Sequence, residues 1–368
     1  MAAISTKGGE VLNKYVLAKI LAFDDSASDA AAACIAKGWG EVRRGPPLLI
    51  GSDACIIGAI SISPDNTMLA VGTNWSDPNG FCESEVVLYD TRTGKLRFQL
   101  LPRHRERNVV RCISFSPDGA AIAVGSSIGL ELYDAATGEL RRRIMGGDVY
   151  FAQIGSNGMV LACGNGESTL FEPLTGAGGS TYQRRWRFVH RSSTATASFS
   201  PDSRMLAVDG YRNFGSLRIL DTVTHALRRL ALNHMCDTVA FSPDGATIAV
   251  GHQNVVGLYD CATGGLQREH VLERDNHHVL TVAFSSAGRL LFTAQFELLE
   301  IHCYATDDGI LQRELDLFGL GKLGHGNYKS EFSKDGSLLA VVGNNYIALC
   351  DVATGKRRLG PRQTTSIA

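Results

Sequence analysis

The stretch that decides the fold is residues 237–264, which read DTVAFSPDGATIAVGHQNVVGLYDCATG. It contains three short apolar runs separated by polar and turn-forming residues, and this pattern predicts three antiparallel strands. The first turn is Ser-Pro-Asp-Gly at 242–245. Proline presets the backbone angle of the second turn position, and Asp-Gly tolerates the angles that remain. One such unit cannot bury its apolar face alone, so the pattern predicts further copies along the chain.

The copies recur at a regular spacing. The first turn residues of the seven units are Ser63, Ser116, Gly155, Ser200, Ser242, Ser285 and Ser333. Their spacings are 53, 39, 45, 42, 43 and 48 residues. Most units also close on Tyr-Asp or a related pair followed by Thr-Gly, as in residues 259–264. Copies at this period predict an all-β fold, a seven-bladed β-propeller of four-stranded antiparallel blades.

The units resemble those of the WD-repeat family, with Tyr-Asp or a relative where that family most often has Trp-Asp. The resemblance covers residues 41–360. The Gly-His pair and the mid-repeat Asp of strong WD repeats are mostly missing, and Gly129 and Val255 stand in that part of their units. The resemblance implies a propeller that binds other proteins.

Composition describes an ordinary globular chain. Of its 368 residues, 44% are hydrophobic and 20% are charged, and the net charge is −1. A net charge this small gives no overall field that favours nucleic acid or an anionic membrane, so neither is an expected partner. The expected partners are other proteins, and the chain is expected to be a monomer within a larger complex.

Cysteine usage and the termini predict the compartment. None of the nine cysteines shows CxxC spacing, so neither a zinc site nor a disulfide framework is expected. The N-terminus lacks a basic region followed by an apolar run, and no apolar segment is long enough to span a membrane. These features predict reduced thiols in a cytoplasmic or nuclear protein.

Residues 1–40 depart from the strand pattern. Apolar residues recur there at helical spacing, and a polar stretch at 24–29 separates two segments, which predicts a short helical hairpin before the propeller. The expected domains are therefore this hairpin at 1–40, the propeller at 41–360 and a tail at 361–368. Two helices this short cannot fold alone, so we expect them to pack on the propeller or on another chain.

The spacing within residues 1–40 resembles an F-box. The resemblance implies that an adaptor-binding stripe is formed by Leu12, Val16, Leu17, Ile20, Leu21 and Trp39. Asn13, Asp24 and Gly38 replace residues that are usual in that family. The alternative is a helical plug that caps one face of the propeller.

Ring closure admits two predictions. Residues 41–50 read as a stray outer strand that adds to the seventh blade, since the last unit leaves little room for its own fourth strand. The competing prediction is that residues 356–360 supply that strand and that 41–50 form a linker, because Pro46-Pro47 disfavour a strand.

Long loops are expected on one rim of the propeller. The loops between second and third strands and the loops between units share that rim, and they carry aromatic residues and arginines of the kind that protein interfaces enrich. The predicted partner-binding residues are Trp75, Phe81, Arg103, Arg105, Arg107, Arg184, Arg185, Tyr211, Arg212, Phe214, His252, Phe296 and Tyr346. Other arginines, such as Arg97 and Arg141, are expected to be exposed charges on outer strands.

Catalysis is not predicted. The sequence has no Gly-x-Ser-x-Gly elbow, Walker loop or HExxH motif, and no cofactor or metal site is expected. Two functions remain open. The first is the substrate receptor of an F-box/cullin-type ubiquitin ligase, whose propeller rim holds an acidic or phosphorylated client. The second is a non-catalytic scaffold for another complex, with the N-terminal helices as a cap.

Overall fold

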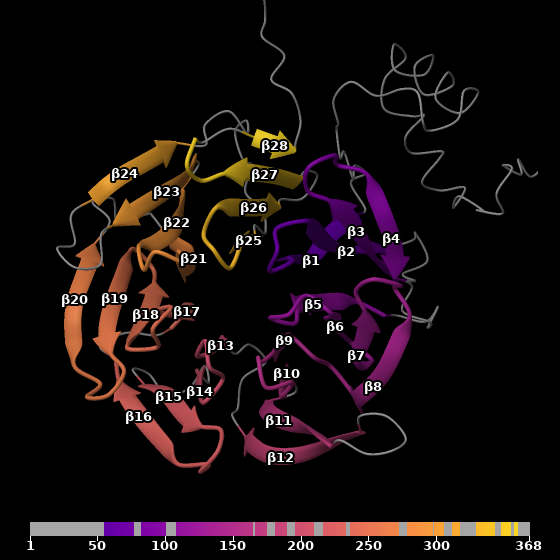
Figure 1. Cartoon of the computed structure of the whole chain (residues 1–368), viewed down its shortest axis with the longest axis horizontal. Coiled ribbons are helices and arrows are strands. Elements are labelled where there is room, and N and C mark those ends of the chain that lie inside the picture. The colour runs from indigo at the N-terminus through magenta and orange to yellow at the C-terminus, as the bar shows by residue number, and fades with distance from the viewer. Residues whose placement is uncertain are drawn as a thin grey trace, which may run out of the picture.

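The structure of the protein is a computed structural model. It describes residues 55–76, 82–100, 108–164, 166–174, 181–189, 196–209, 216–232, 236–271, 278–296, 298–304, 311–316, 329–342, 347–354 and 357–359. In these residues the strands form seven four-stranded antiparallel sheets, which we number as blades in chain order. Figure 1 shows the blades arranged in a ring. Propellers have a central channel, and we use that term for the axis of this ring.

Each blade consists of four strands that are consecutive in the chain. Blade 1 comprises β1 (Cys55–Ile62), β2 (Met68–Ser76), β3 (Cys82–Asp90) and β4 (Leu96–Leu100), and blade 2 comprises β5 (Val110–Phe115), β6 (Ala121–Ser126), β7 (Gly129–Asp134) and β8 (Leu140–Gly146). Blade 3 comprises β9 (Phe151–Ile154), β10 (Val160–Gly164), β11 (Glu167–Leu174) and β12 (Thr181–Val189), and blade 4 comprises β13 (Ala197–Phe199), β14 (Met205–Val208), β15 (Ser216–Asp221) and β16 (Leu227–Ala231). Blades 5 to 7 comprise β17 (Thr238–Phe241), β18 (Thr247–His252), β19 (Val255–Asp260), β20 (Leu266–Val271); β21 (His278–Phe284), β22 (Leu290–Phe296), β23 (Leu298–Tyr304), β24 (Leu311–Asp316); and β25 (Lys329–Phe332), β26 (Leu338–Val342), β27 (Ile347–Asp351), β28 (Arg357–Leu359). The first strand of each blade lies nearest the channel and the fourth lies at the circumference (Figure 1).

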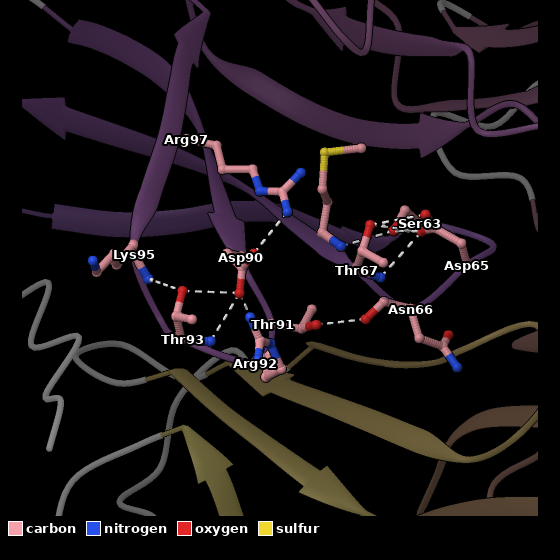
Figure 2. A network of polar contacts seen from close by, with 11 residues as sticks. Ser63, Asp65, Asn66, Thr67, Asp90, Thr91, Arg92, Thr93, Lys95 and Arg97 are labelled. Atoms are coloured by element: carbon pink, nitrogen blue, oxygen red, sulfur yellow. Dashed lines mark hydrogen bonds and ion pairs between the residues drawn. The ribbon is translucent and has the colours of Figure 1, made fainter.

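The Ser-Pro-Asp-Gly turns join the first and second strands, and side chains within each turn hold it. In blade 1, Ser63 Oγ donates to Asp65 Oδ1 (2.6 Å) and accepts from the Met68 backbone N–H (2.8 Å), as Figure 2 shows. The same serine-to-aspartate bond, 2.5–2.7 Å long, recurs at Ser116, Ser200, Ser242 and Ser333. These turns satisfy their own polar groups, which explains why the motif recurs along the chain.

A second recurring turn joins the third and fourth strands. In blade 1, Asp90 Oδ1 accepts from the Thr93 N–H and hydroxyl (both 2.8 Å), and Asp90 Oδ2 pairs with Arg97 (2.7 Å), as seen in Figure 2. The hydrogen bond from Arg97 holds the pKa of Asp90 far below its usual range. Arg141 with Asp134, and Arg358 with Asp351, repeat this ion pair at the same spacing of seven residues. The arginines that were expected to be plain edge charges at positions 97 and 141 therefore brace a turn.

The hydrophobic core lies in the seams between neighbouring blades. Leu130 and Leu132 of blade 2 pack with Val160 and Phe171 of blade 3, and similar clusters join blades 1 and 2, 3 and 4, 4 and 5, 5 and 6, and 7 and 1. Alternate residues of the central strands face opposite seams, and in blades 1 to 5 apolar clusters fill the seams on both sides. Fully burying one such leucine contributes about 2 kcal/mol, and a ring of blades buries both faces of each sheet.

Ring closure follows the competing prediction. β28 pairs with β27 and gives blade 7 a fourth strand from its own end of the chain. The prediction that residues 41–50 fill this position in the seventh blade is therefore wrong, and residues 41–50 themselves lie outside the described residues. Polar side chains join the two ends of the ring, since Asn66 Nδ2 in blade 1 donates to Asp335 Oδ2 (2.8 Å) and Ser337 Oγ (3.0 Å) in blade 7.

The predicted fold class needs a correction. It placed a helical hairpin before the propeller, whereas the described part of the chain is all strand and contains no helix. Residues 1–40 lie outside that part. Helical spacing over so short a stretch is weak evidence by itself, because most of the stability of a short helix comes from tertiary packing. The all-β propeller is confirmed, and the helical hairpin is not carried further.

Candidate partner-binding rim and channel mouth

Two kinds of connection define two rims. The turns from first to second strand and from third to fourth strand, described above, lie on one rim, which we call the short-turn rim. The loops from second to third strand and from blade to blade meet on the other, the loop-rich rim. Contacts between these two kinds of loop show that they share a rim. Asn74 of β2 accepts from the Val110 N–H (2.8 Å) and donates to the Val110 carbonyl (2.9 Å), and Val110 begins β5. The Val279 N–H donates to Gln253 O (2.6 Å).

At the channel mouth on the loop-rich rim, blade-to-blade loops and first strands bring four polar side chains together. Arg111 Nε donates to Asp148 Oδ1 (3.1 Å), and the Tyr150 hydroxyl donates to Asp148 Oδ2 (3.2 Å). The Arg111 guanidinium also lies over the Tyr150 ring, 4.4 Å from its centroid, which is a cation–π contact. Lys329 Nζ donates to Arg111 O (3.3 Å) and to Gly58 O. We call these four side chains the channel-mouth cluster.

The channel-mouth cluster carries two cations and one carboxylate. Arg111 and Asp148 keep 31% and 27% of their side-chain surface exposed, so the ion pair stays within reach of a partner. Burial lowers the pKa of the Lys329 ammonium, and the nearby charge of Arg111 lowers it as well. Arginine, tyrosine and lysine side chains gathered at one opening suit a partner that brings a carboxylate and a flat or apolar group.

A half-buried carboxyl lies two residues further along β25. Glu331 Oε1 accepts from Ser61 Oγ (3.1 Å) and from the Ile62 N–H (3.2 Å), both in blade 1. Burial raises the pKa of Glu331 to about 8, although the two hydrogen bonds oppose that rise. Glu331 therefore joins blades 7 and 1 with a carboxyl that is largely protonated at neutral pH.

The structure places only some of the predicted rim residues. His252 ends β18 on the loop-rich rim, where it is 8% exposed and its Nδ1 lies 2.7 Å from Asp237 Oδ2. Arg184 and Arg185 lie on β12 at the circumference, and Arg185 pairs with Glu172 (2.6 Å). Trp75 and Phe296 belong to strands β2 and β22.

The other predicted site residues lie outside the described part of the chain. On the rim these are Phe81, Arg103, Arg105, Arg107, Tyr211, Arg212, Phe214 and Tyr346. In the predicted adaptor-binding stripe they are Leu12, Val16, Leu17, Ile20, Leu21 and Trp39. Their roles stay predictions.

Sequence reasoning missed the channel-mouth cluster. It searched the loops, whereas Arg111 and Lys329 lie at the beginning of the first strands of their blades. A charged residue near the start of a first strand is the signal that could have found them, because that strand lies nearest the channel.

The described residues lack two other kinds of site. In them, no three or more His, Cys, Asp and Glu side chains are grouped so that they could hold a metal ion. A search of the same residues for a helix long and apolar enough to cross a membrane found none.

Comparisons with known proteins agree with the fold. The family model described as WD40, WD domain, G-beta repeat, matches residues 95–127. This match begins just before β4 of blade 1 and runs through β5 and β6 of blade 2, so one sequence repeat links two neighbouring blades. The chain is 36% identical to echinoderm microtubule-associated protein-like 2 of Homo sapiens over 23% of its own length and 13% of that protein.

Other relatives cover more of the chain at lower identity. Guanine nucleotide-binding protein subunit beta-1 of Nicotiana tabacum is 27% identical over 50% of each chain. The chain thus spans half of that subunit's length and far less of the microtubule-associated protein. A chain in a solved structure titled "Crystal Structure of Mitotic Checkpoint Complex" superposes with a TM-score of 0.65 at 17% identity, covering 84% of this chain and 93% of that one. That likeness shows the fold, and the sequence matches support the WD40 repeat family.

Proposed function

We propose that this WD-repeat-like propeller is a protein-interaction scaffold, which binds a polypeptide partner on the loop-rich rim at the channel mouth. The observation that carries this proposal is the channel-mouth cluster: an arginine, a lysine and a tyrosine from blades 2, 3 and 7 converge at one opening. In the described residues of the short-turn rim, the turn serines and aspartates bond within their own turns or to a turn of the neighbouring blade, as Asp335 does to Asn66, so they are engaged with the propeller itself.

The relatives' names support a role within complexes. One relative is named as a subunit of a guanine nucleotide-binding protein, and the similar solved chain comes from a checkpoint complex. Extended WD-type propellers present several loops at once, which suits binding of a protein surface. No catalytic motif was predicted for this chain, and we propose a non-enzymatic role.

The test is a charge reversal on each rim. Arg111→Glu places a carboxylate beside Asp148 at the channel mouth, whereas Arg92→Glu makes the same change on an exposed residue of the short-turn rim. Tagged wild type and both variants are expressed in cells, and co-purified proteins are quantified by mass spectrometry. We expect Arg111→Glu to lose partners that Arg92→Glu retains. Equal retention by both variants would remove the channel mouth from the proposal.

A narrower role is the substrate receptor of an F-box/cullin-type ubiquitin ligase. It rests on the sequence spacing of residues 12–39, which resembles an F-box, and on the order of that segment before a propeller. A pull-down of the F-box adaptor with wild type and with Leu17→Asp/Leu21→Asp tests this role. Adaptor binding that the substitutions leave unchanged would exclude it. An acidic or phosphorylated client and a cytoplasmic or nuclear location belong to the same proposal.

A further inference from the structure

Arginines gather on the outermost strands of blades 2 and 3. These strands, β8 and β12, carry Arg141, Arg142, Arg143, Arg184, Arg185 and Arg187. Four of the six are ion-paired with a carboxylate in their own blade, namely Arg141, Arg143, Arg185 and Arg187. For Arg142 and Arg184, the described residues contain no hydrogen-bond or ion-pair partner.

The two unpaired arginines lie on the faces that blades 2 and 3 turn toward each other. Arg142 is directly opposite Leu132 in the β7–β8 ladder, and Arg184 is directly opposite Phe171 in the β11–β12 ladder. Leu132 and Phe171 belong to the one apolar cluster that fills the seam between these blades. Residues directly opposite each other share a face of the sheet, so both guanidiniums flank this seam at the circumference. We call this place the blade 2–3 seam.

Apolar side chains line the same seam. Ile144 and Met145 of β8 and Tyr182 of β12 are partly buried and pack against the same cluster. Burial raises the pKa of the Tyr182 hydroxyl, and the positive charges of Arg141 and Arg142 lower it in part, which places Tyr182 within the field of the opposite blade's arginines.

In blades 1, 3 and 4, the side chain at the position equivalent to Arg142 has a partner across its seam. In these blades the third strand closes on Asp or Glu, and the residue two positions before it pairs with a residue of the fourth strand. That fourth-strand residue is Phe98 in blade 1, Trp186 in blade 3 and Arg228 in blade 4. Phe98 and Trp186 pack on the apolar cluster of the next seam. Arg228 donates to two backbone carbonyl oxygens of blade 5. Each of these side chains therefore has a partner across its seam, whereas the described residues contain no partner for Arg142.

Arg142 and Arg184 therefore leave positive charge without a carboxylate partner at this seam. A carboxylate of a partner protein can pair with either guanidinium, whose fork matches it in geometry as well as charge. Arginines beside partly buried aromatic and aliphatic side chains are also the composition of interface hot spots.

We propose that the blade 2–3 seam is a second interaction surface, which binds an acidic segment of a partner protein. Carboxylates of the segment pair with Arg142 and Arg184, and an apolar side chain of the segment covers Tyr182, Ile144 and Met145. This surface is on the circumference, separate from the channel mouth, so a chain can engage one partner on each. Partner binding here does not depend on the channel-mouth cluster.

The probe is a fluorescein-labelled peptide that alternates glutamate and leucine, titrated with the full chain and followed by fluorescence anisotropy. A peptide alternating lysine and leucine is the charge control. We expect saturable binding of the acidic peptide, weakened by salt. Arg142→Gln/Arg184→Gln is expected to weaken it about tenfold, which corresponds to about 1.4 kcal/mol. Arg97→Gln/Arg358→Gln removes the same charge from paired arginines of blades 1 and 7 and is expected to change binding less than about twofold.

Thermal melts check that each variant folds. If Arg142→Gln/Arg184→Gln does not fold, Arg184→Gln alone, at an exposed position, replaces it. Sedimentation with phosphatidylserine vesicles is the last arm. The proposal is overturned if the acidic peptide fails to saturate, if both double variants weaken binding equally, or if the chain binds the vesicles and not the peptide. Arg111→Glu should leave peptide binding unchanged, so failure here and failure of the channel-mouth proposal are distinguishable.

Discussion

The two rims of this propeller differ in how regularly their polar side chains are arranged. On the short-turn rim, the same serine-to-aspartate bond recurs from turn to turn, and the serine hydroxyl lowers the pKa of the turn's carboxyl in Asp118, Asp202 and Asp244. Some side chains there also join neighbouring blades, as Asn66 does to Asp335. On the loop-rich rim, polar side chains reach across blades, as Asn74 does to Val110 and Lys329 does to Gly58. The short-turn rim stabilises the turns of the blades. The loop-rich rim varies from blade to blade, contacts neighbouring blades and presents side chains that a partner can bind.

Substitutions on the two rims should therefore have different effects. A change of a turn serine on the short-turn rim, such as Ser242, removes bonds within one turn, so its effect should be confined to stability. A change on the loop-rich rim affects the packing of neighbouring blades and the channel-mouth cluster together. Four predictions follow from this contrast, in order of expected size.

The largest effect is expected from Gly164→Ala on the loop-rich rim. A Cβ atom at Gly164 would lie 1.7 Å from Asp148 O, so the loop that carries Asp148 must move. We expect a loss of about 3 kcal/mol in the free energy of unfolding by urea denaturation. Gly146→Ala is the matched control, because its nearest atom would be 3.8 Å away, and it should change stability by less than about 0.5 kcal/mol. Equal stability of the two variants would contradict the close approach.

A pH-dependent effect is expected at the junction of blades 7 and 1. Burial raises the pKa of Glu331 to about 8 in the folded chain, so folding takes up a proton at pH values between the ordinary carboxyl pKa and 8. The stability of the fold therefore falls as pH rises through that window. Glu331→Gln keeps an oxygen that accepts from Ser61 and Ile62 and removes the titration. At pH 9 the variant should exceed wild type by on the order of 2 kcal/mol, and the gap should close by pH 5. A pH-independent gap would contradict the raised pKa of this carboxyl.

A moderate loss of stability is expected from Ser242→Ala on the short-turn rim. The Ser242 hydroxyl donates to Asp244 Oδ1 (2.5 Å) and accepts from the Thr247 N–H (2.9 Å), so its removal leaves both groups without that partner. We expect a cost of about 1–2 kcal/mol in thermal or urea unfolding, with partner binding unchanged. Ser286→Ala, at an exposed turn position of blade 6, is the control. Loss of partner binding in Ser242→Ala would break the contrast between the rims.

The smallest effect is expected from Arg97→Gln. The Arg97 side chain is 42% exposed and the Asp90 side chain is 16% exposed, so solvent reaches their ion pair from the arginine side. Exposed pairs contribute little, so we expect a change below about 0.5 kcal/mol in urea unfolding at physiological salt. A loss above about 1.5 kcal/mol would show that this brace on the third-to-fourth-strand turn matters more than its exposure indicates.

The fold could be predicted from the sequence because the repeats carry their own turns. In blade 5, the turn from Ser242 to Gly245 marks where one strand ends and the next begins. The same turn signal recurs along the chain. Each turn is a local structure, held by bonds such as Ser242 to Asp244, so no distant residue is needed to interpret it.

The candidate sites could be predicted only in part. The loop-rich rim followed from strand order, but the channel-mouth cluster joins Arg111 to Lys329, which are 218 residues apart and meet only because the ring closes. Arg184 shows the opposite error. It was assigned to a loop, whereas β12 extends from Thr181 to Val189 and places Arg184 at the circumference. Strand ends and β-bulges, such as the one between Leu170 and Phe171, shift which face a residue occupies and are not visible in the pattern.

The most direct test of the central claim, that partners bind the loop-rich rim, is hydrogen–deuterium exchange of the chain with and without a co-purified partner. The account predicts slower exchange on binding at residues 108–111 and 147–150, around the channel mouth, and unchanged exchange at residues 116–121 and 90–95 on the short-turn rim. Protection confined to the short-turn rim would contradict it.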